Sequence, residues 1–308
     1  VAVGRSQINP ETIQTIAGRA KILPMLLSLV IMSLAFLFLG LRWKSLFPQP
    51  HNPPGAGLAA ILCAGLLLNS ALPGPVGEFG AAWFAHKRYR APLGTTLAAG
   101  MGARIIGMIM AALAALLCWF WADLPIPEGY DTTIQATALL VGGLGMGLAM
   151  AVIMPHLLAR ISQVTIARIP KLNKLHRLIE EVTDALTTLR DSGVGSFLRC
   201  IAWSGVAHSC VLAGIGIAAW SLGAEPSLAG LLFTYATTTA AVIVMFALPG
   251  SQVGWDAIFL TLLTTTAGLH MADALAVAIV VRVQQLCIMV AGAIALSWLA
   301  RSSQEADV

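Results

Sequence analysis

The sequence predicts an all-α, polytopic helical membrane protein with two pseudo-symmetric halves. Hydrophobic residues make up 58% of the 308 residues and charged residues only 10%, whereas a soluble globular domain carries about 25% charged residues. Apolar runs near the ~20 residues that cross a bilayer core recur along the chain. Pro and Gly interrupt the chain at matching places in the two halves. We therefore expect one membrane domain over residues 1–308, with seven full spans and, in each half, one half-length, re-entrant helix.

The elements of the first half are delimited by their apolar runs and by the segments between them. Pro73 and Gly74 follow the second run, where they are expected to break the helix. A basic cluster over 86–90 ends the short segment behind the break, and an acidic loop over 123–131 carries no basic residue. Full spans are expected over 22–40, 56–72, 92–122 and 133–156, with the half-length segment over 76–85.

A polar connector over about 157–195 separates the halves. Its apolar residues recur at spacings of three and four, which predicts an amphipathic helix. Two interpretations stay open: a helix that lies on the membrane surface, or a solvated connector packed on the protein. The second half then breaks at Pro249 and Gly250. Full spans are expected over 197–222, 227–248 and 270–300, with the half-length segment over 253–266.

The basic residues predict how the chain is oriented, because Lys and Arg favour the cytoplasmic side of a membrane. The 86–90 cluster and the basic connector are expected inside, and the acidic 123–131 loop outside. This scheme makes the N-terminus cytoplasmic. Arg42 and Lys44 fit it poorly, since it places them on the outer side.

Several function classes lack support in the sequence. The net charge is +4, but no basic stripe with interleaved aromatic residues suggests nucleic-acid binding. None of the five Cys forms a CxxC pair, so we expect neither a metal site nor disulfides. No paired-carboxylate, nucleophile or ATP-binding signature appears, and no cofactor is expected. We therefore expect a protein that is not an enzyme.

The strongest signal is an internal repeat, with a first copy over about 56–122 and a second over about 227–300. In each copy a Gly-acid motif follows the Pro-Gly break. In each copy an Arg lies 26 residues after the acid and 12 residues after the start of a long apolar helix. The repeated residues are Gly77, Glu78 and Arg104 in the first copy and Gly254, Asp256 and Arg282 in the second.

These matched features indicate a central polar site. At about 1.5 Å per residue, twelve residues place each Arg roughly 18 Å along its helix, near the middle of the membrane. A broken helix leaves N–H and C=O groups that lipid cannot satisfy, so a break needs surrounding protein or a water-filled cavity. Matching breaks in two halves point to a transporter's binding site. The alternative is that the breaks are kinks and that the Arg-acid pairs only fix the fold.

Three further groups of polar or small residues stand out in the spans. Gly143 and Gly147 give a GxxxG spacing that lets helices approach closely. His208 near Ser204 is expected to hydrogen-bond between helices, because a hydrolase would also need an acid and an oxyanion site. The hydroxyl cluster of residues 234–239 either lines the cavity or bonds to its own helix backbone.

The motifs resemble the lysylphosphatidylglycerol synthase transmembrane domain family, flippase-like membrane proteins that include hopanoid-associated members. Its first-half pattern, Asn-x-x-Leu-Pro then Gly-Glu, is similar to residues 69–78, and its Pro-Gly-Gly-x-Gly-acid pattern is similar to residues 249–256. Pro75 replaces a basic residue that is often found there, and the second acid is Asp. The resemblance carries over Pro73, Gly77, Glu78, Pro249, Gly250, Gly254 and Arg282.

The resemblance implies a lipid translocase that moves an amphipathic lipid, with an anionic head group, between leaflets of the bacterial cytoplasmic (inner) membrane. The alternative is an accessory protein that presents lipid to a membrane-bound synthase or glycosyltransferase. No aminoacyl-transfer domain is recognisable, so lysyl transfer is not expected. The expected partners are a membrane lipid and a lipid-modifying enzyme, without nucleic acid. The candidate substrate-binding residues are Asn69, Pro73, Gly74, Gly77, Glu78, Arg104, Pro249, Gly250, Gln252, Gly254, Asp256, Arg282 and Gln285.

Overall fold

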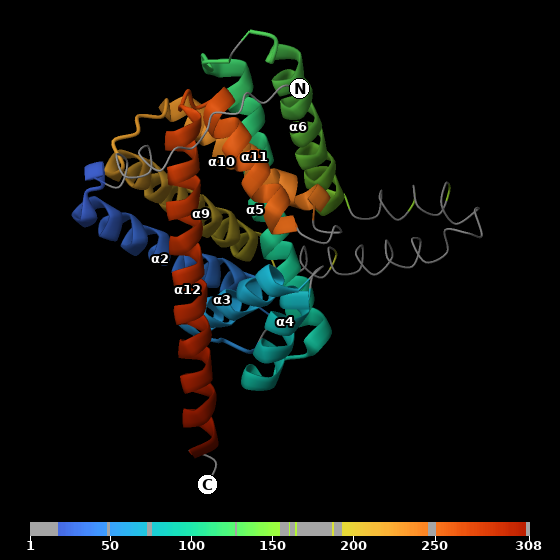
Figure 1. The fold of residues 1–308 in the computed structure, drawn as a ribbon. Coiled ribbons are helices and arrows are strands. Elements are labelled where there is room, and N and C mark those ends of the chain that lie inside the picture. The colour runs from blue at the N-terminus through green and yellow to red at the C-terminus, as the bar shows by residue number, and fades with distance from the viewer. Residues whose placement is uncertain are drawn as a thin grey trace.

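The computed structural model is all-helical over the residues that it describes (Figure 1). These are residues 18–47, 50–72, 76–126, 128–154, 193–245 and 251–305, together with 160, 164 and 187. Most of the connector over 157–195 lies outside them. The helices are α2 (Ile22–Ser45), α3 (Gly55–Ala71), α4 (Val76–Tyr89), α5 (Leu93–Trp121), α6 (Asp131–Ile153), α9 (Val194–Ser221), α10 (Leu228–Met245), α11 (Ser251–Thr265) and α12 (Met271–Glu305).

Four of these helices are long and apolar enough to cross a membrane, namely α2, α5, α9 and residues 271–297 of α12. Seven full spans were expected, whereas four of the described helices are long and apolar enough to cross a membrane. The reason is clearest for α3, whose 17 residues rise only about 26 Å, short of a core about 30 Å thick. It and α10 are shorter apolar helices, while the expected 133–156 span is a helix of 23 residues, α6.

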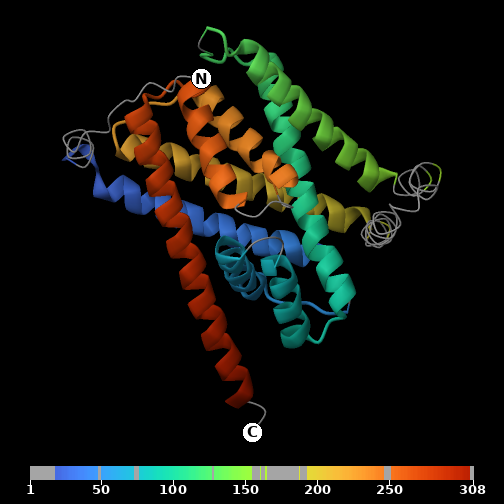
Figure 2. The ribbon, with the colours of Figure 1, turned by 45° about the vertical axis from the view of Figure 1, so that its right-hand side comes forward.

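The N-terminal span α2 packs most extensively on α9, and both views show the two helices side by side (Figures 1 and 2). Gly214 of α9 lies against the Met32 side chain of α2, where an added Cβ would collide. The Ser28 hydroxyl lies 2.8 Å from the Gly214 carbonyl oxygen and 3.0 Å from Oε1 of Gln284 on α12. The Gln284 amide donates to the Met25 carbonyl at 3.1 Å. These buried hydrogen bonds connect α2 with α9 and α12.

Each half contains a helical hairpin that precedes a long helix: α3 and α4 before α5, then α10 and α11 before α12. In the first hairpin Gly65 and Gly77 sit back to back, and a Cβ on either would meet the other's carbonyl oxygen. In the second hairpin, the buried hydroxyls of Thr234 and Thr266 hydrogen-bond at 3.0 Å. The same order of elements therefore occurs in both halves.

The two halves also pack across each other. Helix α3 packs on α12, and α10 packs on α5, so each hairpin's first helix lies against the long helix of the other half. At the first interface Gly292 faces Cys63, with no room for a Cβ. At the second interface the Cys118 thiol donates to the Ala229 carbonyl at 3.3 Å. The core of the molecule is thus shared between the halves.

Among the described residues, no helix packs against the Gly143 and Gly147 pair, which corrects the expectation from the GxxxG spacing. Gly143 and Gly147 of α6 are exposed, and no heavy atom would meet an added Cβ at either. Gly142 and Gly145 make the close approach instead, against Leu116 and Ala112 of α5. The spacing alone does not say which face of a helix will meet its neighbour.

Candidate functional site

The first candidate cluster forms where α4 begins. Glu78 on α4 makes an ion pair with Arg104 on α5. Asn69 on α3 accepts a hydrogen bond from the Gly77 N–H at 2.6 Å and donates one to Glu78 Oε1 at 3.3 Å. The N–H groups in the first turn of a helix have no partner within that helix. Asn69 therefore satisfies one of them and also orients the carboxylate that holds Arg104.

The second candidate cluster forms where α11 meets α12. Asp256 accepts hydrogen bonds from Nε and Nη2 of Arg282, the first at 3.1 Å. Arg282 also lies over the Trp255 ring, 5.0 Å from its centroid, and donates to Gln285 Oε1 at 3.3 Å. Its planar fork thus has a carboxylate, an amide and an aromatic face as partners. Both ion pairs that the repeat predicted are present.

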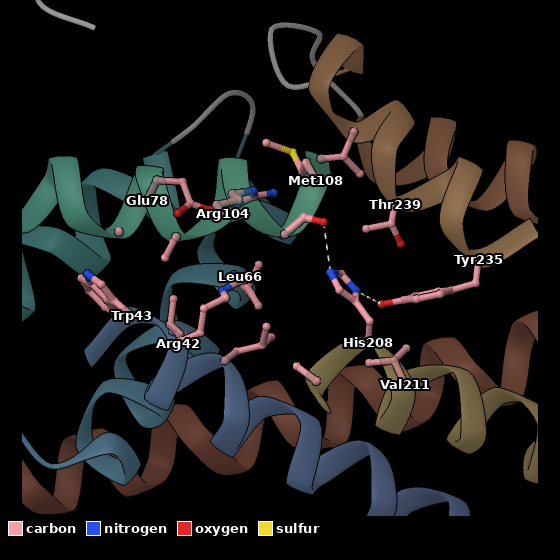
Figure 3. A pocket seen from close by; sticks show the side chains of 17 residues that line it. Arg42, Trp43, Leu66, Glu78, Arg104, Met108, His208, Val211, Tyr235 and Thr239 are labelled. Atoms are coloured by element: carbon pink, nitrogen blue, oxygen red, sulfur yellow. Dashed lines mark hydrogen bonds and ion pairs between the residues drawn. The ribbon is translucent and has the colours of Figure 1, made fainter. Parts of the chain in front are cut away.

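The two clusters border one interior space. A cavity of about 210 Å³ is lined by Arg104 from the first half and by Arg282 and Gln285 from the second, with Asn69 also in its wall. An adjoining cavity of about 190 Å³ is lined by Glu78 and again by Arg104 (Figure 3). The expectation of a central cavity built by both halves agrees with this geometry.

The wall of the space is mostly apolar away from the charged groups. A site with charged groups at one part and an apolar wall suits an amphipathic ligand, whose two ends differ in the same way. The apolar side chains that line the 210 Å³ cavity come from α2, α3, α9, α10 and α12, and they are Met32, Phe36, Leu39, Leu66, Val211, Val242 and Met289.

A histidine bridges three helices beside the charged groups. His208 Nε2 on α9 lies 3.1 Å from the Gly107 carbonyl oxygen on α5, and Nδ1 lies 2.6 Å from the Tyr235 hydroxyl on α10 (Figure 3). A carbonyl only accepts, so these contacts assign the proton to Nε2 and make Tyr235 the donor to Nδ1. Ser204 donates to the Cys200 carbonyl of its own helix. The predicted interhelical hydrogen bonding is therefore confirmed.

In the hydroxyl cluster of α10, some side chains line the cavities and others hydrogen-bond to the backbone of their own helix. Tyr235 and Thr239 line both cavities. Thr238 donates to the Thr234 carbonyl of its own helix at 2.6 Å. Position on the helix face decides which role each hydroxyl takes.

Sequence reasoning missed Arg42, Trp43 and His208 as cavity residues. Arg42 stood out only because it disagreed with the predicted orientation. That disagreement was the available signal, since a charge that violates the positive-inside bias needs another reason to be there. In the structure Arg42 belongs to the cavity wall.

Other predicted site residues lie outside the described residues or make no described contact in the two clusters. Pro73, Gly74, Pro249 and Gly250 lie outside the described residues, as does the side chain of Gln252. Gly254 is partly buried in α11, two residues before Asp256. The described cluster residues are thus Asn69, Gly77, Glu78, Arg104, Asp256, Arg282 and Gln285.

Comparison with known proteins agrees with the motifs. The family model described as lysylphosphatidylglycerol synthase TM region matches residues 1–293. No curated protein and no solved structure matches the chain. The match includes every residue that lines the two cavities.

Proposed function

The chain belongs to the lysylphosphatidylglycerol synthase TM region family, and from this premise we propose that it translocates an amphipathic lipid with an anionic head group between membrane leaflets. The observation that carries the proposal is the presence of Arg104 and Arg282, one from each half, in the wall of the same cavity. An Arg inside a membrane costs at least about 2.5–3.5 kcal/mol. Two of them around one space support binding of a negatively charged group there.

The two hairpins supply the architecture for this proposal. We interpret α3–α4 and α10–α11 as re-entrant elements of two pseudo-symmetric repeats, which meet at a site near the bilayer midplane. Asn69 supports this interpretation, because it satisfies the N–H of Gly77 that the break leaves free. A location in the bacterial cytoplasmic membrane with a cytoplasmic N-terminus stays a prediction.

The chain has no role as an enzyme in this proposal. The residues around the cavity hold and orient a head group while the apolar wall accommodates the acyl chains. The driving force would come from the lipid gradient, an ion gradient or the membrane potential. A membrane-bound lipid-modifying enzyme is the proposed partner.

The test is leaflet exchange of fluorescent phospholipids by the purified chain in liposomes. Arg104→Ala and Arg282→Ala are expected to abolish most exchange above protein-free liposomes. Arg199→Ala is the matched control, because Arg199 is exposed and donates to Ser196 of the same helix. Unchanged exchange in both cavity variants, with wild-type thermal unfolding, would refute the mechanism. Lipid binding without exchange would instead favour the lipid-presenting role.

A further inference from the structure

Arg42 lies in the wall of the 190 Å³ cavity, although neither repeat contains it. It extends from the C-terminal part of α2 toward α5 and lines the cavity with Glu78 and Arg104 (Figure 3). Its Nη1 sits against Gly107 of α5, where an added Cβ would collide with it. The absence of a side chain at Gly107 is therefore what makes room for the guanidinium.

The charges around the two cavities do not cancel. Arg104 has Glu78 as its ion-pair partner, and Arg282 has Asp256. Within the part of the chain that the structure describes, Arg42 has no carboxylate partner, and its buried Nε atom has no hydrogen-bond partner. Among the described residues, three arginines against two carboxylates leave one positive charge in the wall.

A second donor beside Arg42 also lacks an acceptor. The Trp43 indole is 2% exposed and lines the same cavity, and its Nε1 has no hydrogen-bond partner among the described residues. A buried donor without an acceptor is costly, and native structures leave few of them. Both donors belong to residues that line one cavity, where acceptor oxygens of a bound group would satisfy them.

We propose that Arg42 and Trp43 bind the phosphate of a lipid whose head group carries one net negative charge. This inference rests on the proposed function and adds the charge class of the substrate. A phosphodiester without an amine matches the single excess positive charge. A zwitterionic head group would bring its own ammonium, while Glu78 and Asp256 are already used by the arginines. A doubly charged phosphomonoester would leave a negative charge uncompensated in a low-dielectric space.

Binding, rather than exchange, tests this assignment. The detergent-solubilised full chain is titrated with fluorescent phosphatidylglycerol, and binding is followed by anisotropy. Unlabelled phosphatidylglycerol, phosphatidylethanolamine and phosphatidic acid compete in separate arms, and water-soluble glycerophosphoglycerol competes in a fourth arm. Phosphatidylglycerol is expected to compete about tenfold better than the other two lipids, the worth of one charge-assisted hydrogen bond. It should also compete far better than the soluble diester.

Variants of Arg42 and Trp43 test which side chains produce the preference for phosphatidylglycerol. Arg42→Gln is expected to bring phosphatidylglycerol and phosphatidylethanolamine to within about twofold of each other, because the excess charge is gone. Arg42→Lys keeps the charge and should keep most of the preference. Trp43→Phe removes one donor and should weaken phosphatidylglycerol binding severalfold. Arg199→Ala should bind as wild type does. If Arg42→Gln does not fold, Trp43→Phe carries the test, because it removes one donor and leaves the charge of Arg42 in place.

The outcomes separate this inference from the proposed function. A wild-type chain without the charge preference, or a folded Arg42→Gln chain that keeps it, overturns the inference even if lipid exchange occurs. Equal competition by glycerophosphoglycerol overturns the assignment to a lipid head group. A preference that depends on Arg42, in a chain that exchanges no lipid, upholds the inference and refutes translocation.

Discussion

Arg104 on α5 and Arg282 on α12 come from different halves of the sequence and line the same interior cavity. Each is held by a carboxylate that lies 26 residues before it, on the short helix of its own half. The two ion pairs differ in exposure, since the Glu78 side chain is 13% exposed and the Asp256 side chain is 45% exposed. This difference allows the contributions of the two pairs to be separated.

Removing the charge of Glu78 should destabilise the protein more than removing that of Asp256. Glu78→Gln leaves Arg104 without its counter-charge in a buried setting, where breaking such a pair costs about 3–5 kcal/mol. Asp256→Asn should cost less, because Arg282 keeps Gln285 and the Trp255 ring as partners. Unfolding in detergent, followed by circular dichroism, measures both. Equal losses would show that exposure does not set the strength of these pairs.

Asn69 is predicted to hold the first break in place. Asn69→Leu removes the acceptor of the Gly77 N–H and should lower the free energy of unfolding by about 1–3 kcal/mol. Ser70→Ala is the neighbouring control, because Ser70 is exposed and donates only to the Leu66 carbonyl of its own helix. Denaturant titration of both variants compares them directly. A loss no greater than that of the control would contradict the role of Asn69.

Gly107→Ala should displace Arg42 without removing any charge from the protein. The new Cβ would occupy the place of the Arg42 guanidinium, and it would also lie 3.4 Å from His208 Nε2. We expect the preference for phosphatidylglycerol to fall about tenfold, as for loss of one charge-assisted hydrogen bond. The same competition assay measures it. Gly143→Ala, where no atom lies within 4 Å of the new Cβ, should leave the preference intact.

The protonation of His208 can be checked by spectroscopy. In a neutral ring, the contact to the Gly107 carbonyl places the proton on Nε2 and makes Tyr235 the donor to Nδ1. Selective ¹⁵N labelling of histidine should show a protonated Nε2 and an unprotonated Nδ1 that shifts in Tyr235→Phe. A proton on Nδ1 would mean that the Tyr235 hydroxyl accepts rather than donates.

Sequence reasoning predicted the Glu78–Arg104 and Asp256–Arg282 pairs because spacing within a repeat is a one-dimensional property. It missed Arg42, since nothing local reveals that the end of α2 lies against Gly107 of α5. It misjudged Gly143 for a related reason: a GxxxG spacing defines a helix face but not the neighbour of that face. The all-helical fold followed from composition, whereas the length of α3 depended on where the chain turns.

The cross-packing of α3 on α12 and of α10 on α5 makes the two halves mechanically inseparable. Gly292 packs closely against Cys63 where α12 meets α3, and the Cys118–Ala229 hydrogen bond joins α5 to α10. A hairpin that tilts in one half would therefore displace the arginine-bearing helix of the opposite half. We expect that a rearrangement of the kind that the proposed translocation requires moves both arginines together.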